Sequence, residues 1–470
     1  MKKGIKKSLG ITLAMVLSLG ALTACGGAKD PADDKKETES SVVKETEKET
    51  ETSETEQIPE KDMGGMVVTI ASWADVVEPE EKANAQEEEL WNYRHEMMDK
   101  WNFGFEEKAI VQWNTSLEQF STSTMAGTPE AEIFRFHTNF VLGAMNSELA
   151  YDLATLDSID LKDPKWNQSA IEVMTRGDSV YGIATNAEPR LGLYYNKRLF
   201  EEAGLDPELL YDLQASGEWT WEKFEEISEK VTRDIDNDGV SDVYAINASA
   251  SEFYKIVVLS NNGKYVDIDE NGKYVNASTS PETMEALQWA TDYFAKDYDL
   301  YPESWETTYQ EQLFTNGKVA MTIADRWKTM IWKDMEDDFG FVCFPKGPKA
   351  DNYSVMSNDE IWVIPNTYSK EEAENIISAL DVWANPAPGY TAEEAFMTTQ
   401  YPLFRDDRAV DETLALMREP GVAKIDFCNI IPEVTTNAFA DDLYWNGVTP
   451  TQALESKKGE WEAAIEAANK

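Results

Sequence analysis

The stretch "LGLYYNKRLFEEAGLDP", residues 191–207, decides the fold. Its uninterrupted apolar run at 191–195 predicts a buried strand. Asn196 is placed to cap a following helix, and Gly204 and Pro207 end that helix. A buried strand followed directly by a short capped helix is typical of an α/β protein.

The same alternation continues on both sides of this stretch. Upstream, the β-branched run "MVVTIASW" at 66–73 predicts a first strand. Downstream, Thr220 is placed to cap a helix, and the stretch at 317–327 predicts a turn and a buried strand. Further strands are expected at 104–113, 132–136 and 339–345, and helices at 87–102, 221–231, 369–386 and from 449 onward. This order predicts an α/β fold with parallel strands.

Composition narrows the range of functions. The chain has 470 residues, enough for two or three domains, with 42 Lys and Arg against 88 Asp and Glu and a net charge of -46. Such a chain lacks the clustered cations that nucleic acid requires. His95 and His137 are its only imidazoles, which leaves little for a catalytic triad or a multi-histidine zinc site. Cys343 and Cys428 either pair or remain buried free thiols. These properties favour a highly soluble extracytoplasmic protein.

The amino terminus resembles a secretion signal, predicted over residues 1–24. Four lysines precede a short apolar run that ends in small residues. The sequence "LTAC" is similar to the bacterial lipobox, so we expect cleavage after Ala24 and a lipid on Cys25; an ordinary signal peptide with an incidental cysteine is the alternative. Residues 25–62 are expected to form a disordered acidic tether. The folded part would then be held at the cell surface, on the outer face of the bacterial cytoplasmic membrane.

Several stretches taken together resemble one family. The lipobox, "YYNKRLFEEAGLDP", "TWEKF", "DIDNDGVSDVY" and "FTNGKVAMTIADRW" are similar, in order and spacing, to the extracellular solute-binding proteins of bacterial ABC importers, and in particular to the carbohydrate-binding cluster that includes maltose-binding proteins. The resemblance implies a periplasmic-binding-protein fold: two α/β lobes joined by a hinge, with the ligand in the interlobe cleft. It places lobe 1 at 63–186 plus 343–390 and lobe 2 at 187–342 plus 391–470, with hinge crossings near 183–189 and 339–345.

Candidate ligand contacts follow from this resemblance and from one rule. Ligands of open α/β sheets bind beyond the carboxyl ends of the strands. Aromatic rings pack on the C–H faces of sugars, while Asp, Asn and Arg bind the hydroxyl groups. By the resemblance, Trp327 matches a sugar-stacking tryptophan. The candidate ligand-binding residues are Trp73, Asp75, Trp113, Phe136, Asn139, Trp327, Asp359 and Trp362.

Competing interpretations apply to several of these positions. Each tryptophan has packing in the core as its alternative. His137 is expected to be a hydrogen-bonded structural residue, and Arg135 is expected to contact either a ligand or an acidic neighbour. Asp359 and Trp362 lie in "SNDEIWVIP", where relatives usually have a glycine-rich turn, so their contribution is the least supported by the resemblance.

The stretch "DIDNDG" begins like a calcium-binding EF-hand loop. Asp234, Asp236, Asp238 and Asp242 fall at positions one, three, five and nine. Position twelve is Ala245 instead of the bidentate glutamate, and a strand-like run follows instead of a helix. We therefore expect no calcium sensor. A structural calcium ion and a metal-free Asx turn are the two alternatives, and no cofactor is required.

The sequence thus predicts a membrane-anchored, monomeric solute-binding protein. It would capture a carbohydrate, which we expect to be an oligosaccharide, by lobe closure and deliver it to the permease subunits of an ABC importer. No bond is broken in this process, so no enzymatic activity is expected. The alternatives are a secreted carbohydrate-active enzyme with paired carboxylates and a binding protein for a non-sugar solute.

Overall fold

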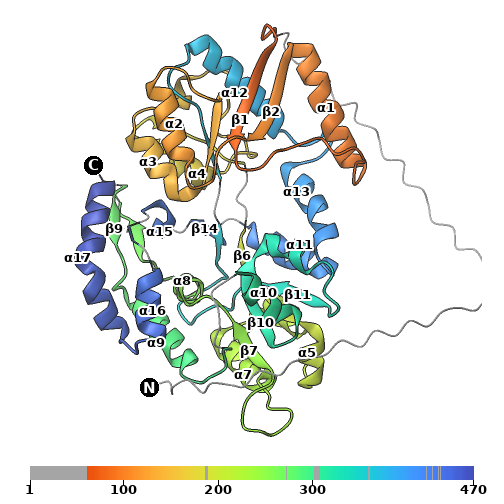
Figure 1. The fold of residues 1–470 in the computed structure, drawn as a ribbon, viewed down its shortest axis with the longest axis vertical. Coiled ribbons are helices and arrows are strands. Elements are labelled where there is room, and N and C mark those ends of the chain that lie inside the picture. The colour runs from red at the N-terminus through yellow and green to blue at the C-terminus, as the bar shows by residue number, and fades with distance from the viewer. Residues whose placement is uncertain are drawn as a thin grey trace, which may run out of the picture. The chain divides into compact units, whose positions relative to one another are not determined.

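Figure 1 shows the computed structural model of the protein, which describes residues 61–185, 189–270, 272–300, 307–357, 360–419, 421–425, 427–431, 433–434 and 436–469. The predicted signal peptide, Cys25 and most of the predicted tether lie outside these residues, as does Asp359. Within the described ranges, no helix is long and apolar enough to cross a membrane.

The first sheet has four strands in the order β13-β3-β1-β2. Central β1 (Met66–Ser72) pairs in parallel with β2 (Phe103–Ala109) and β3 (Ile133–Phe136), whereas β13 (Ile361–Val363) is antiparallel to β3. The three strands predicted in the amino-terminal part are therefore confirmed. Because β1, β2 and β3 are parallel, their carboxyl ends meet at one edge of the sheet.

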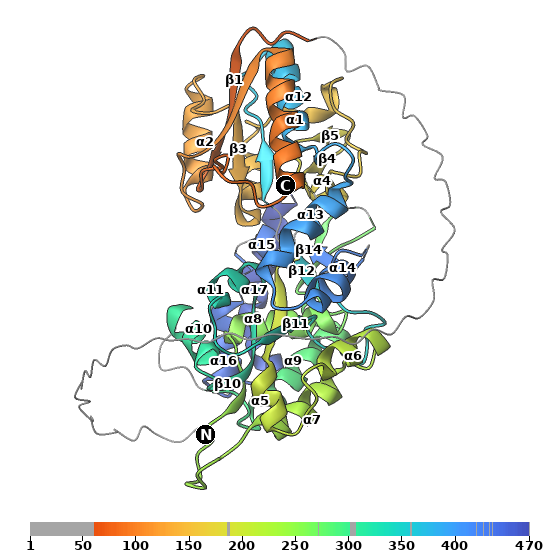
Figure 2. The same ribbon diagram turned by 90° about the vertical axis from the view of Figure 1, so that its right-hand side faces the viewer.

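Helices cover both faces of the first sheet, as Figures 1 and 2 show. α1 (Ala85–Trp101) and α12 (Lys370–Ala384) lie on the face where Val68 and Ile70 are buried. α2 (Ser116–Met125) packs on the other face against β3. The sheet is thus buried on both sides, which accounts for the apolar character of β1.

The second sheet has the order β11-β6-β10-β7. β10 (Val319–Asp325) is antiparallel to β6 (Leu191–Asn196) and parallel to β7 (Tyr244–Asn247), and β11 (Phe339–Val342) is antiparallel to β6. All six residues of β6 are buried, as the apolar run predicted. The carboxyl ends of β7 and β10 therefore lie at the same edge as the amino end of β6.

Two predicted helix caps are present in the α/β unit that is built around the second sheet. The Asn196 side chain accepts a hydrogen bond from the Leu199 backbone N–H at 3.1 Å and begins α5 (Lys197–Glu202). The Thr220 side chain accepts from the backbone of the first turn of α7 (Trp221–Val231). Each cap satisfies a backbone donor that the helix itself leaves unpaired.

The chain returns to the first sheet later than predicted. β11 remains in the second sheet, and Trp219 Nε1 donates to the Cys343 carbonyl at 2.9 Å. The chain then passes through β12 (Val355–Ser357), which pairs with β14 (Ala423–Ile425), and enters the first sheet only at β13. The expected crossing near 339–345 is therefore corrected to the segment around β12, because the backbone of β11 finds its hydrogen-bond partners on β6.

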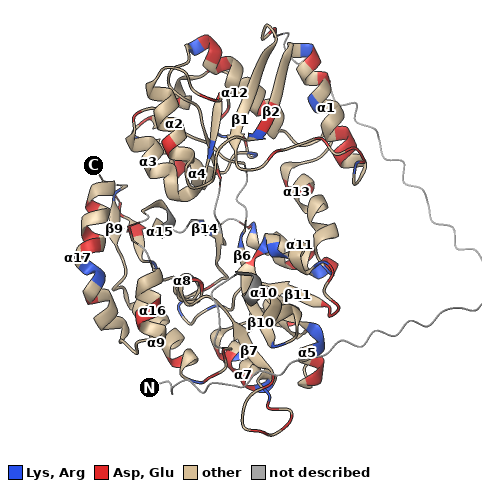
Figure 3. Ribbon diagram, viewed as in Figure 1, with Lys and Arg blue, Asp and Glu red and all other residues tan. Residues whose placement is uncertain are grey.

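The other elements complete the two α/β units. Cys343 and Cys428 are both buried, and they do not form a disulfide bond with each other. Figure 3 shows charges of both signs along α1 and α17.

The remaining helices and strands are, in chain order, η1 (Thr138–Phe140), α3 (Val141–Asn146), η2 (Leu153–Thr155), α4 (Gln168–Val173), β4 (Thr175–Arg176), β5 (Ser179–Val180), α6 (Leu209–Ser216), α8 (Ala250–Ser260), β8 (Val266–Ile268), β9 (Tyr274–Asn276), α9 (Pro281–Phe294), α10 (Thr307–Thr315), η3 (Arg326–Lys328), α11 (Thr329–Trp332), α13 (Ala392–Gln400), η4 (Tyr401–Leu403), η5 (Ala409–Leu414), α14 (Ala415–Met417), α15 (Phe427–Ile430), α16 (Asn437–Tyr444) and α17 (Pro450–Ala468).

Candidate functional site

Paired charges occupy the edge of the first sheet where β1, β2 and β3 end. We name Glu107, Arg135, Arg190 and Glu360 the strand-end ion cluster. Arg135 Nη1 donates to Glu107 Oε1 at 2.6 Å, and its Nη2 forms an ion pair with Glu360. Glu360 Oε1 also accepts from Arg190 Nη2 at 3.0 Å. Glu360 therefore joins an arginine of β3 to an arginine that directly precedes β6 in the second sheet.

Sequence reasoning found only part of the strand-end ion cluster. The pairing of Arg135 with acidic neighbours confirms one of its two expected roles. Glu107, whose side chain is only 6% exposed, was missed, although alternation along β2 places it on the same face as Phe103 and Phe105. No local pattern marks Glu360 as a partner of two arginines.

Trp73 and Asp75 follow β1, as predicted. The half-buried Trp73 ring lies beneath the Arg135 guanidinium, 5.1 Å from the ring centroid. Asp75 Oδ1 accepts from the Ala109 backbone N–H at 2.8 Å. Trp73 is thus next to the strand-end ion cluster, whereas Asp75 ties the loop after β1 to the end of β2.

Trp113, His137 and Asn139 lie together beyond the ends of β2 and β3. The Trp113 side chain is 48% exposed, and its ring contacts His137 edge-on with centroids 6.0 Å apart. His137 Nδ1 accepts from the Asn139 backbone N–H at 3.3 Å. Burial, assisted by the positive charge of Arg190, lowers the pKa of His137 to about 4. His137 is therefore neutral at physiological pH and orients the turn that carries Asn139, in the structural role expected for it.

Asn139 and Phe136 have different surroundings. Asn139 is half-buried, and its Oδ1 has no hydrogen-bond partner among the described residues. Phe136 is fully buried and packs edge-on against Phe120 with ring centroids 5.3 Å apart. Because side chains alternate along β3, Phe136 points to α2 and Arg135 to the opposite face. We therefore correct the prediction for Phe136, which belongs to the core in this structure.

Trp327 lies in η3, as the second residue after the end of β10 in the second sheet. Its side chain is 37% exposed, and its Nε1 donates to Asp325 Oδ2 at 3.0 Å. Lys328 Nζ lies 4.2 Å from the ring centroid and also pairs with Glu311. The indole is thus held by a hydrogen bond and a cation while part of its surface remains open to solvent.

Glu252 is a further polar residue at this edge, in the first turn of α8 after β7. Its side chain is accessible to solvent but crowded by protein. Desolvation by that protein, together with the negative charge of Asp325, raises the pKa of Glu252 to about 7. A carboxyl group that is partly protonated at neutral pH both donates and accepts hydrogen bonds. Sequence reasoning missed Glu252, because the pattern of a helix start does not show what faces it.

Trp362 lines a cavity in which the other predicted aromatic contacts take no part among the described residues. Its backbone is opposite Arg135 in the sheet, but its side chain lines a different cavity of about 300 Å³, together with Arg94, Trp383 and Phe396. The Trp362 Nε1 atom is buried without a hydrogen-bond partner in the described part of the chain. Among the described residues, Trp73, Trp113 and Trp327 do not line this cavity.

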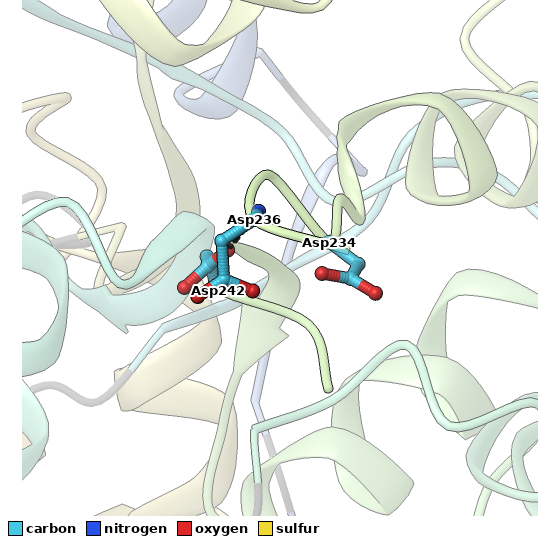
Figure 4. A group of neighbouring side chains, drawn as sticks. All are labelled: Asp234, Asp236 and Asp242. Carbon is cyan, nitrogen blue, oxygen red and sulfur yellow. Dashed lines mark hydrogen bonds between the residues drawn. The ribbon is translucent and has the colours of Figure 1, made fainter. Parts of the chain in front are cut away.

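The aspartate loop joins α7 to β7, at the edge of the second sheet opposite to the end of β10. Asp234, Asp236 and Asp242, drawn in Figure 4, each offer a carboxylate oxygen within 4.8 Å of the other two. Asp238 is not in this group, and its carboxylate accepts from the loop backbone. Asp234 Oδ2 also accepts from the Gly239 backbone N–H at 2.8 Å. These three carboxylates, of which that of Asp242 is only partly exposed, fit the preference of calcium for oxygen ligands, and the loop is also ordered by its own hydrogen bonds.

Comparison with known proteins gives the same fold. A maltooligosaccharide ABC transporter solute-binding lipoprotein of Streptococcus pneumoniae is 27% identical over 208 residues, which cover 43% of this chain and 44% of that relative. The structure of a cyclo/maltodextrin-binding protein complexed with maltotetraose matches with a TM-score of 0.61 and 16% identity over 86% of this chain and 98% of the other. A cyclic alpha-maltosyl-1,6-maltose binding protein from Arthrobacter globiformis matches with a TM-score of 0.62 and 17% identity over 86% and 100%. These likenesses confirm the predicted two-lobed fold.

The family follows from the sequence itself. The profile of the family described as "Bacterial extracellular solute-binding protein" matches residues 92–380, which is more than half of the chain. The chain belongs to the bacterial extracellular solute-binding protein family.

Proposed function

We propose that this protein binds an oligosaccharide between its two lobes and delivers it to an ABC importer. The observation that carries the proposal is Trp327, whose partly open indole follows β10 and is held by Asp325 and Lys328. An aromatic face beside charged hydrogen-bonding groups suits a sugar ring, which has apolar C–H faces and polar edges. The names of the relatives, which refer to maltooligosaccharides and maltodextrins, support this ligand class.

The first sheet supplies the opposing contacts in this proposal. Trp113 and Trp73 offer aromatic surface, and Asn139 offers an amide at the end of β3. A sugar that contacts both sheets binds the closed arrangement more tightly than the open one, and the difference in affinity shifts the population toward closure. Closure around a ligand is an established type of domain motion in two-lobed binding proteins.

The same proposal covers location and partners. A lipid on Cys25 and the tether at 25–62 hold a monomer at the outer face of the membrane, within reach of the permease subunits. The relative from Streptococcus pneumoniae, which is named as a lipoprotein of an ABC transporter, supports this arrangement.

A binding role also agrees with the carboxylates of the first sheet. A glycosidase needs two carboxyl groups that flank the scissile bond, one of them as a general acid. Glu107 and Glu360 instead share Arg135, which holds both as ion-paired partners. We therefore propose no enzymatic step.

Isothermal titration calorimetry of the chain from residue 26 tests the proposed function. Maltotetraose is expected to bind with a Kd of about 1 μM and to be recovered intact by chromatography. Glucose, a tetrapeptide and spermidine serve as competing ligand classes. Tighter binding of the peptide or of spermidine contradicts the sugar class, and recovery of shortened sugar contradicts the binding role.

A further inference from the structure

A cavity of about 240 Å³ lies among α4, α8, β8, β12 and β14. The described residues of its lining include none of the predicted ligand contacts and none of the strand-end ion cluster. Much of its wall is apolar, with buried side chains such as Val173, Val258, Val266 and Met356. A cavity of about 150 Å³ lined by apolar side chains holds a benzene molecule. The present cavity therefore has room for a ring with a short substituent.

The charge of the lining is opposite to that of the whole chain. The chain has 88 acidic and 42 basic residues, whereas the described residues that line the cavity include Lys255, Lys264 and Lys424 but one carboxylate, that of Glu172. Local charge, more than net charge, determines which small ion a pocket attracts. The lining consequently favours an anion.

Among the described residues of the lining, Lys424 is the cation whose recorded hydrogen-bond partner is neutral. Its Nζ donates to the Asn262 side-chain oxygen at 3.1 Å, and that amide is neutral. Lys264, by contrast, has a carboxylate partner, Asp267 Oδ1 at 2.6 Å. Burial, together with the nearby charge of Lys264, lowers the pKa of Lys424. An incoming anion would supply a counter-charge to a partly buried ammonium group.

We propose that this cavity is a second ligand site, for a small organic carboxylate with an apolar body of about the size of a benzene ring. The apolar body contacts the wall formed by Val173, Val258 and Val266, and the carboxylate pairs with Lys424. The combination of an apolar chamber and a lysine at its border resembles the general make-up of small-molecule sites, in which a few polar groups orient a largely apolar ligand.

The test uses two probes of nearly the same shape, phenylacetate and its neutral analogue 2-phenylacetamide. Both are titrated by calorimetry into the chain from residue 26, with maltotetraose absent and present. We expect phenylacetate to bind at least about tenfold more tightly than the amide, because only the acid carries the charge that Lys424 recognises. The lining combines α4 of the first lobe with elements of the second, so lobe closure around maltotetraose is expected to change this affinity by a finite factor without competition for the cavity.

Variants locate the binding. Lys424→Met should weaken phenylacetate about tenfold or more and leave the amide unchanged, whereas Lys424→Arg keeps the charge and should retain binding within about threefold. Lys458→Met, at an exposed lysine of α17, is the matched control and should bind as the parent does. Thermal unfolding of each variant confirms that it is folded. Equal affinity for the two probes, equal losses in Lys424→Met and Lys458→Met, strictly competitive displacement by maltotetraose, or no binding of phenylacetate up to about 20 mM would each overturn the proposal.

Discussion

The two sheets carry different side chains at the edges where the carboxyl ends of their parallel strands lie. At the first sheet, Arg135 is held by Glu107 and Glu360, and these charges are largely buried and paired. At the second sheet, Trp327 remains 37% exposed, and the Glu252 carboxyl has a raised pKa. The strand-end ion cluster of the first edge is thus built from groups that satisfy one another, whereas Trp327 at the second edge, like Trp113 near that cluster, still presents open surface.

This difference separates two ways in which a polar residue contributes. A buried charge that loses its partner destabilises the fold, because its partner is then left desolvated and unpaired. An exposed aromatic residue contributes little to folding and a great deal to binding when a ligand covers it. Substitutions in the strand-end ion cluster should therefore affect stability, and substitution of the exposed Trp327 should affect affinity.

Removal of Arg135, the arginine of β3 at the first edge, should have the largest effect, and this effect is on the stability of the fold. Arg135→Met leaves Glu107 and Glu360 without this partner and should lower the free energy of unfolding by about 3 kcal/mol. Urea denaturation measures the change, and Arg176→Met, at an exposed arginine, is the control. Adding Glu107→Gln should recover part of the loss. A loss below about 1 kcal/mol would show that the cluster is not the stabilising element that its burial indicates.

Truncation of Trp327 at the second edge should change the affinity for sugar strongly and the stability of the fold only slightly. Trp327→Ala should weaken oligosaccharide binding by about tenfold to thirtyfold, which corresponds to about 1.4–2 kcal/mol, while the free energy of unfolding changes by less than about 0.5 kcal/mol. Calorimetry and urea denaturation give the two values. Ile235→Ala, which shortens an exposed apolar side chain on the aspartate loop, is the control. A variant that binds the sugar normally would remove Trp327 from the site.

The raised pKa of Glu252 predicts a pH dependence specific to the second edge. The folded protein binds a proton at Glu252 more tightly than the unfolded chain does, so stability contributed by this group decreases as the pH rises from about 4.5 to about 7. Glu252→Gln should make the midpoint of thermal unfolding less dependent on pH in this range and raise it above pH 7. Glu455→Gln on α17 is the control, and identical pH profiles of the two variants would contradict the assignment.

The aspartate loop, at the opposite edge of the second sheet, should show the smallest effect. Calcium bound there is expected to stabilise the protein by about 1.4 kcal/mol when its concentration is ten times the Kd. The double variant Asp234→Asn/Asp236→Asn should lose the response to calcium and, because like charges are removed, should be slightly more stable without the ion. Thermal unfolding in calcium, magnesium and EDTA measures this. An unchanged midpoint in calcium would leave the loop as a metal-free Asx turn.

Local signals predicted much of the fold. Asn196 and Thr220 cap the helices that they were expected to cap, because a cap depends on a side chain and on backbone groups only two or three residues away. Trp113 and Trp327 are partly exposed beyond strand ends, where the strand pattern placed them. The same rule gave a wrong prediction for Phe136, since a position at a strand end does not tell which face of the sheet the side chain occupies.

By itself, the sequence determined the alternation of strands and helices, the helix caps, the resemblance to solute-binding proteins and the acidic character of the chain. These properties depend on neighbours along the chain or on composition. Only the tertiary structure decided that Glu360 joins Arg135 to Arg190, that Trp362 lines a separate cavity, and that β11 pairs with β6 instead of returning to the first sheet. Such contacts connect residues far apart in the chain, and their geometry arises from packing of the whole fold, which no local pattern specifies.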